Sequence, residues 1–359
     1  MSTRDDTVII VGGGQSGQAA ARAARDADLR PLILEAGERP VGSWPGYYDS
    51  LTLFSPARHS AMPGAPFPGG PDRYPHRDEV AAYLERHAAQ LDVEIRTGTR
   101  VEAVEADAPG FTVRTADGRT LNAAGLIAAS GSFANPHLPA LPGHEDFPGE
   151  LLHVADYRSP EPYAGKRVVV VGGGNSAVQV GYELSRTAST TLATRAPIRF
   201  LHQLRNGRDL HDWLVATGFD RLPPEWLIHY VGGTLVVETG DYENALNSGR
   251  MDRREMFTAF DGDHVVWADG RREPVDAVLF ATGYRPDLDY LRPLGALDGD
   301  GAPLHTGGVS ATHPGLVYAG LEFQRSFSSN TLRGVHRDAE HVVAPLAAHV
   351  RKAPTAAGL

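Results

Sequence analysis

Two runs of consecutive apolar residues, at positions 8–11 and 168–171, each end directly at a cluster of glycines. A short run that is apolar at every position is typical of a strand buried on both faces of a parallel sheet. Small residues with helical character follow each glycine cluster. Both regions therefore predict a strand, a tight turn and a helix in succession.

Further elements follow from the same pattern. Residues 78–90 have the spacing of an amphipathic helix, and Asp117-Gly118 is typical of a hairpin turn. A second helix is predicted from about Asn330, with Thr331 opening it after a capping residue. Strands are predicted at residues 31–34, 93–96, 111–115, 120–122, 125–129, 190–193, 277–281 and 316–319.

The two glycine clusters have the spacing of dinucleotide-binding fingerprints, with glycines at 12, 13, 14 and 17 and at 172, 173 and 174. The first glycine permits the tight turn, the second lets the backbone approach a pyrophosphate, and a small third residue lets the helix pack on the strand. The helix N-terminus then faces the phosphates. Two bound dinucleotides are therefore implied.

The residues after each fingerprint separate the two ligands. The strand after the first fingerprint ends on Glu35, where a carboxylate can accept hydrogen bonds from ribose hydroxyls, as in FAD. The strand after the second ends on Thr194 and Arg195, with Arg199 nearby and no acid in the ribose position. This arrangement favours NADPH, which carries a 2′-phosphate. Arg195 as an ordinary solvated charge is the alternative.

The predicted fold class is α/β, with two Rossmann-like dinucleotide-binding domains and the NADPH domain inserted into the FAD domain. Residues 1–157 and 285–359 are expected to form the discontinuous FAD-binding domain. Residues 158–284 are expected to form the NADPH-binding domain, with an irregular insert at about 196–258. The strands that end near Ser130-Gly131 and Thr282-Gly283 mark the expected crossings.

Composition narrows the chemistry. The chain has 359 residues, of which 42% are hydrophobic and 22% charged, as expected of a globular protein with two domains. A net charge of −10 argues against a nucleic-acid partner. The absence of cysteine excludes dithiol chemistry, and no metal is expected. The sequence shows no membrane span and no signal peptide, which favours a cytoplasmic protein.

A family resemblance rests on several motifs. Phe147, Gly149, His153 and Tyr157 fit the pattern F-x-G-x-x-x-H-x-x-x-Y immediately before the second fingerprint. This resembles the identifying motif of class B flavin monooxygenases, which include flavin-containing monooxygenases, N-hydroxylases and Baeyer-Villiger enzymes. Residues 42–44 resemble the G-x-W segment of that family, and residues 281–284 resemble its A-T-G-Y segment. Segments around 47–56 and 207–214 are also similar to small bacterial members linked to arsenical detoxification.

The resemblance implies an FAD-dependent NADPH monooxygenase. In such an enzyme NADPH reduces FAD, dioxygen adds at flavin C4a, and the hydroperoxide transfers one oxygen atom to a soft nitrogen, sulfur or arsenic atom of a small substrate. Two alternatives stay open: an electron-transfer reductase without oxygen insertion, and a flavin-binding sensor without turnover. A homo-oligomer also stays open, and the sequence does not identify the substrate.

Candidate residues follow from the fingerprints and the resemblance. The FAD candidates are Gly12, Gly14, Gln15, Ser16, Gly17, Glu35, Ser43, Trp44, Ser55, Ser130, Gly131, Thr331 and Leu332. The NADPH candidates are Gly172, Gly174, Asn175, Ser176, Thr194, Arg195 and Arg199.

No catalytic side chain is required by flavin chemistry, and the candidates for a catalytic role are Phe54, His153 and Tyr157. Phe54 stands where typical flavin-containing monooxygenases carry an asparagine beside the flavin ring. His153 and Tyr157 are spaced to share one helical face, or they anchor the linker between the domains. Trp44, Phe54, Phe323 and Phe327 are either walls of a dry flavin pocket or ordinary core residues.

Overall fold

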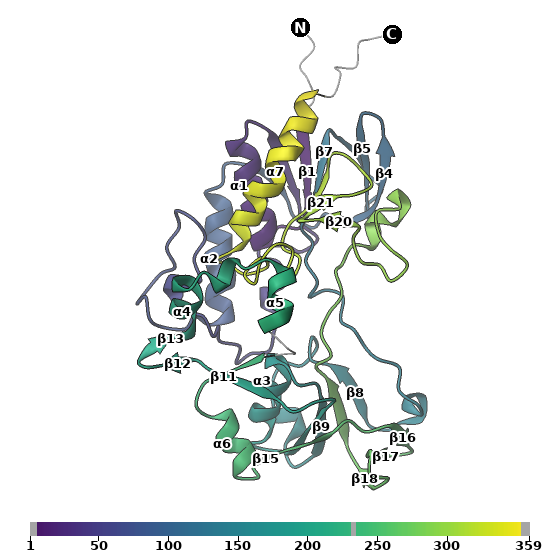
Figure 1. Cartoon of the computed structure of the whole chain (residues 1–359). Helices are drawn as coiled ribbons and strands as arrows, with labels where there is room; N and C mark the ends of the chain where they lie inside the picture. Colours follow the sequence, from purple (N-terminus) through teal and green to yellow (C-terminus); the bar gives the residue numbers. More distant parts are fainter. Residues whose placement is uncertain (1–5, 231–234, 353–359) are drawn as a thin grey trace.

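The computed structural model describes residues 6–230 and 235–352. Figure 1 shows two α/β bodies, an upper one that carries the chain termini and a lower one formed by the middle of the sequence. Each body is built around its own mainly parallel sheet. The predicted α/β class with two Rossmann-like domains is confirmed.

The first domain contains a seven-stranded sheet. In sheet order its strands are β20 (His305–Thr306), β21 (Val309–Ser310), β22 (Leu316–Tyr318), β7 (Gly125–Ala128), β1 (Thr7–Val11), β2 (Arg30–Leu34) and β3 (Glu94–Arg96). Side chains of β1 alternate between two cores: Val8 and Ile10 pack toward helices, and Ile9 packs on the opposite face. The helices are α1 (Gln15–Asp26), α2 (Arg77–Ala89) and α7 (Val335–Lys352). An antiparallel sheet covers the opposite face and consists of β4 (Val101–Asp107), β5 (Gly110–Thr115) and β6 (Thr120–Ala123).

The second domain contains a five-stranded parallel sheet. Its order is β15 (Met251–Glu255), β10 (Ser189–Thr194), β9 (Arg167–Val171), β19 (Ala277–Phe280) and β8 (Glu150–His153). One face packs on α3 (Asn175–Leu184) and α6 (Tyr242–Asn247). The other face packs on a small antiparallel sheet of β16 (Ala259–Asp261), β17 (His264–Val266) and β18 (Arg272–Pro274).

Two antiparallel connections join the domains. The amide of His137 donates to the carbonyl of Gly283 at 3.0 Å, and the amide of Arg285 donates to the carbonyl of Asn135 at 2.9 Å. The expected boundary at residue 157 places β8 in the first domain, but β8 pairs with β19 and belongs to the second sheet. A four-residue strand carries no signal of its partner in its own sequence, since pairing is a tertiary property. The parts of the expected ranges at 1–5, 231–234 and 353–359 lie outside the described residues.

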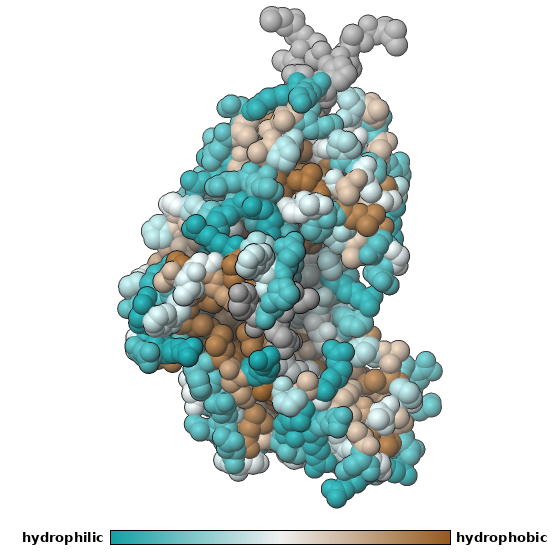
Figure 2. Space-filling model, viewed as in Figure 1, coloured by the Kyte–Doolittle hydropathy of each residue, from teal (hydrophilic) through white to brown (hydrophobic). Residues whose placement is uncertain are grey.

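The segment at 196–258, which was expected to be irregular, contains regular elements. They are β11 (Arg199–His202), β12 (Leu204–Arg205), β13 (Arg208–Asp209), α4 (Leu210–Ala216), α5 (Pro224–Tyr230) and β14 (Leu235–Glu238), together with α6 and β15. These elements are short, and their apolar positions are too few to give a readable period. Figure 1 shows α4 and α5 beside the first domain, and Figure 2 shows apolar surface gathered below α4 at the junction.

Two local predictions are wrong. The last helix begins at Val335 and not at Asn330, because residues 330–334 form turns in which the Thr331 amide donates to the Ser328 carbonyl. His153 ends a strand and Tyr157 follows a turn, so the two do not share a helical face. The other predicted strands, the helix at 78–90 and the hairpin turn at Asp117-Gly118 lie within about three residues of the observed elements.

Candidate active site

A cavity of about 840 Å³ lies where the strands of the first sheet end. It is lined by the first glycine loop, the end of β2, the loop around residues 42–59, the crossing at 129–134 and the turn at 330–333. Ligands of open parallel sheets bind at this edge, outside the carboxyl ends of the strands. The cavity is therefore the candidate site for a dinucleotide.

The glycine loop at this cavity has no room for side chains. Gly12 has a φ of +106°, and a Cβ there would lie 2.6 Å from the Ala129 carbonyl oxygen. A Cβ on Gly17 would lie 1.8 Å from the Gly12 carbonyl oxygen, so only glycine lets α1 approach β1. Gly14 is the N-cap of α1 and directly precedes the open amide groups of its first turn. The loop forms the cradle that a pyrophosphate requires.

Glu35 directly follows β2 and lines the cavity beside this loop. Its carboxylate accepts hydrogen bonds from the Gly13 amide at 2.6 Å and from the Gly37 amide at 2.7 Å. Although the side chain is buried, the carboxylate oxygens retain further lone pairs, so it can also accept from a ribose. The position of Glu35 fits the adenosine half of a bound FAD.

Gln15 links three segments at the cavity. Its side-chain oxygen accepts from Nε1 of Trp44 at 2.8 Å, and its side-chain nitrogen donates to the Asn330 carbonyl at 2.8 Å. The neighbouring Ser16 is buried against Gly320, where an added Cβ would lie 1.9 Å from the serine Oγ. These contacts connect the start of α1 to the loop that carries Trp44 and to the turn at residues 330–333, and all three segments line the large cavity.

The crossing between the domains forms another wall. Ser130 donates from Oγ to the Asp287 carbonyl at 2.6 Å and lies 3.2 Å from the Tyr290 hydroxyl. Gly131 follows in a left-handed conformation, with a φ of +73°. Burial raises the pKa of the Asp287 carboxyl, which also lines the cavity. Thr331 lines the cavity from a turn, so its position depends on that turn rather than on a helix N-terminus.

Ser43, Trp44, Phe54, Ser55 and Leu332 also line the cavity. Ser55 Oγ lies 2.8 Å from the Oγ of the buried Ser60.

Phe54 stands between two spaces. It lines the large cavity and also a second cavity of about 350 Å³, lined from both domains by Tyr48, Gln179, Tyr242 and others. Phe323 and Phe327 are absent from the lining of the large cavity. Phe323 is 39% exposed and Phe327 packs edge-on against Phe219, so of the two alternatives given for this pair, the role as cavity walls does not hold.

The second fingerprint has the same backbone form as the first. Gly172 has a φ of +140°, and a Cβ there would lie 2.4 Å from the Ala281 carbonyl oxygen. Gly174 is the N-cap of α3 and Ser176 lies in its first turn. The side chain of Asn175 accepts from the Val237 amide at 2.9 Å, which ties β14 to the glycine loop.

The end of β10 carries the charges expected for a 2′-phosphate. Thr194 is buried, and Arg195 and Arg199 are exposed beside it. Sequence reasoning missed Arg253, whose Nε donates to Thr194 Oγ1 at 2.7 Å from the adjacent strand β15. No local signal marks Arg253, because its proximity to Thr194 depends on the pairing of β15 with β10.

His153 and Tyr157 hold the domain junction together. Nε2 of His153 lies 3.1 Å from the Gly283 carbonyl, and Nδ1 accepts from the Ala155 amide at 3.1 Å. Burial lowers the pKa of His153. Tyr157 is fully buried and donates to Glu183 on α3 at 2.9 Å, and burial raises its pKa. Neither side chain lines the large cavity, and the contacts of both are those of anchors.

Several cavity residues lie outside the predicted set. They include Tyr47, Leu53, His59, Arg100, Asp289, Asn330 and Arg333. They come from distant segments and share no motif, so only the fold brings them together. Within residues 6–230 and 235–352, no three His, Cys, Asp or Glu side chains are arranged to hold a metal ion. No helix of that described part is long and apolar enough to cross a membrane.

The fold and the two glycine loops define a flavoprotein with two dinucleotide-binding domains. A family model described as pyridine nucleotide-disulphide oxidoreductase matches residues 9–215, and the chain belongs to this family.

Similar proteins match this chain over most of its length. A solved flavin-containing monooxygenase from Stenotrophomonas maltophilia superimposes with a TM-score of 0.84 at 32% identity, covering 96% of this chain and 99% of that one. The rice (Oryza sativa subsp. japonica) indole-3-pyruvate monooxygenase YUCCA1 is 31% identical, covering 80% of this chain and 79% of its own length. The uncharacterized oxidoreductase CzcO of Bacillus subtilis is 28% identical over 93% of this chain and 97% of its own length.

These matches confirm the resemblance to flavin monooxygenases. The protein is an FAD-dependent oxidoreductase of the monooxygenase type, and FAD and NADPH are the cofactors that its family implies.

Proposed function

We propose that the protein transfers one oxygen atom from dioxygen to a soft nucleophilic nitrogen, sulfur or arsenic atom of a small molecule, using NADPH as the reductant. The observation that carries this proposal is the cavity of about 840 Å³. It is lined both by the first glycine loop and by residues 129–134, where the chain crosses between the domains. Bound FAD, once reduced, supplies the activation of dioxygen, which is chemistry that belongs to the cofactor.

In this proposal the first domain holds FAD. Glu35 would bind the adenosine ribose and the amides at residues 12–17 would bind the pyrophosphate, which leaves the rest of the cavity, lined also by Trp44 and Phe54, for the flavin. Trp44 and Phe54 present apolar surface there, and excluding water from reduced flavin favours oxygen transfer over release of hydrogen peroxide.

The second domain holds NADPH. The open amides after Gly174 receive its pyrophosphate, and Arg195, Arg199 and Arg253 provide positive charge where the adenosine ribose carries its 2′-phosphate. His153 and Tyr157 act in this proposal as positioning residues that fix the orientation of the two domains.

A stopped-flow measurement tests the function. The FAD-loaded protein is reduced with NADPH and mixed with dioxygen, with and without an aryl alkyl thioether as a soft sulfur nucleophile. We expect a transient absorbance distinct from both reduced and oxidised flavin, which decays faster with the thioether and yields the sulfoxide. Direct reoxidation without a transient or sulfoxide would favour the alternative, an electron-transfer reductase.

The preference for NADPH is tested at Arg195. Because only NADPH carries the 2′-phosphate, Arg195→Ala should raise KM for NADPH about tenfold and leave KM for NADH within about twofold. Arg271→Ala is the control, because Arg271 is an exposed arginine in the turn between β17 and β18. Equal losses with both nucleotides would remove the assigned role of Arg195.

A further inference from the structure

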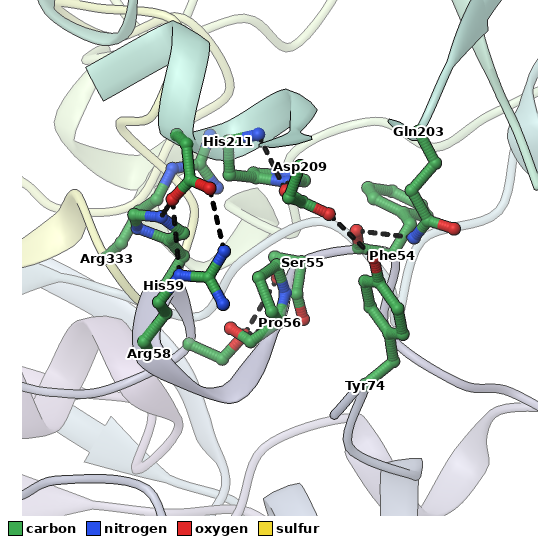
Figure 3. A network of polar contacts seen from close by, with 12 residues as sticks. Phe54, Ser55, Pro56, Arg58, His59, Tyr74, Gln203, Asp209, His211 and Arg333 are labelled. Carbon is green, nitrogen blue, oxygen red and sulfur yellow. Dashed lines mark hydrogen bonds and ion pairs between the residues drawn. The ribbon is translucent and has the colours of Figure 1, made fainter. Parts of the chain in front are cut away.

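Acid-base side chains from both domains gather near Phe54 (Figure 3), and one of them, His59, lines the large cavity. We call these residues the His59 cluster: Arg58, His59, Tyr74, Asp209, His211 and Asp212. Arg58, His59 and Tyr74 come from the loop after β2, and the other three come from β13 and α4. Asp209, His211 and Asp212 lie in the segment 207–214 that resembles small bacterial members of the family, whereas Arg58 and His59 lie outside the recognised motifs.

His59 is the member that lines the cavity. Its Nε2 lies 2.7 Å from Oδ1 of Asp212, and its side chain is 16% exposed. Among the described residues, Nδ1 of His59 has no hydrogen-bond partner. Because Nε2 is held by a carboxylate, Nδ1 is the ring nitrogen available to a molecule in the cavity.

Asp212 is kept ionised by its neighbours. Arg58 donates to both of its oxygens, from Nε at 3.2 Å and from Nη2 at 2.8 Å. The hydrogen bond from Arg58, followed by that from His59, lowers the pKa of Asp212 to about 2. An ionised carboxylate on Nε2 fixes the orientation of the ring, so that an acid role would place the second ring proton at Nδ1.

Other titratable and charged groups lie around His59. His211 lies 6.2 Å away between ring centres, and burial lowers its pKa. Its Nδ1 lies 2.8 Å from Asp209, which also accepts from the Tyr74 hydroxyl at 2.7 Å. Nearby charges include Asp72, which pairs with Arg58, and Arg333, which lines the same cavity and is paired with Asp220.

We propose that His59 is a catalytic acid in the oxygen-transfer reaction, with Asp212 as its positioning residue. The inference rests on the proposed function, since it assumes that the reacting part of FAD lies at the Phe54 end of the cavity. Glu35, the first glycine loop, Phe54 and His59 all line this one cavity, which is the observation behind that assumption.

The reaction requires such a proton. For each turnover NADPH provides two electrons and a hydrogen as hydride, one oxygen atom of dioxygen bonds to a lone pair of the substrate, and the other leaves as water. The balance requires one further proton. In our proposal the N–H bond at Nδ1 of His59 breaks, an O–H bond forms on the departing oxygen, and His59 regains a proton from solvent. Release of hydrogen peroxide without substrate consumes the same proton.

The variant His59→Gln distinguishes a role in proton transfer from a purely structural role. The amide nitrogen of glutamine can occupy the position of Nε2 and donate to Asp212, but no atom of glutamine supplies a titrating proton. The first measurement is a pH titration of the absorbance of bound oxidised FAD between about pH 5 and 8, where histidine titrates. It needs neither turnover nor a substrate. We expect an inflection in the wild-type protein that is lost in His59→Gln.

The second measurement is the pH dependence of substrate-free reoxidation and of thioether oxygenation. We expect both rates to fall at least tenfold in His59→Gln and to lose their pH dependence, within the range typical of general acid catalysis. His264→Gln is the matched control, because His264 forms a pair with Asp263 at 2.6 Å in the small sheet of the second domain. It should leave both the titration and the rates unchanged.

Two results would overturn the proposal: a His59→Gln protein that keeps the inflection, or one whose rates stay within twofold of the wild type. If His59→Gln does not bind FAD, His59→Ala with added imidazole decides, since free imidazole should restore the rate if a proton donor is missing and should not restore it otherwise. Reoxidation of the wild type with neither a transient nor sulfoxide would instead count against the proposed function, whereas the flavin titration would still report on His59.

Discussion

The buried ion pair between Asp220 and Arg333 connects the segment at 196–258 to the first domain. Its removal should lower the free energy of unfolding substantially. Asp220 accepts from Nη2 of Arg333 at 2.8 Å and from Nε at 3.1 Å, and the two side chains are 4% and 11% exposed. Removing one partner of such a pair leaves a buried charge without compensation, which costs about 3–5 kcal/mol. We therefore expect Asp220→Ala to lower Tm on the order of 10 °C.

A matched pair on the surface provides the control. Arg39 and Glu85 form the same two-pronged contact, at 3.0 and 2.9 Å, but are 46% and 48% exposed. Glu85→Ala should cost less than about 1 kcal/mol, because water already solvates both charges. Thermal unfolding of both variants, followed by circular dichroism of the FAD-free protein, compares the two. Equal shifts in Tm would refute the reasoning, since they would mean that burial does not set the cost.

Three further predictions concern the FAD site and acid stability. Gly17→Ala should abolish FAD binding in equilibrium dialysis, because its Cβ would lie 1.8 Å from the Gly12 carbonyl oxygen; Gly299→Ala, with open space around it, should bind normally. Trp44→Phe should weaken FAD binding about fivefold through loss of the 2.8 Å bond to Gln15, and unchanged affinity would contradict this. Burial lowers the pKa of the histidines at 87, 153, 211, 305, 336 and 341. The unfolded chain then binds more protons below about pH 6.5, so Tm should fall as the pH decreases from 7.5 to 5.5, and a flat profile would count against it.

Both glycine loops could be predicted because each is contained in one short stretch of chain. The strand at 8–11, the turn at Gly12 and the helix after Gly14 are consecutive, so the pattern of apolar and small residues is sufficient to indicate them. Glu35 could be placed for the same reason, since the strand that carries it follows the helix directly. The small elements of the segment at 196–258 gave no comparable signal, and the start of the last helix was missed by about five residues.

The sequence by itself determined the fold class, the presence of two dinucleotide loops and the family, because all three depend on local spacing and on residues that no other type can replace. Only the tertiary structure decided that β8 joins the second sheet, that Arg253 lies on Thr194, and that His59 meets Asp212 across 153 positions of the chain. Such contacts depend on which strands pair and which surfaces are buried together, and the residues that make them carry no sign of their partners.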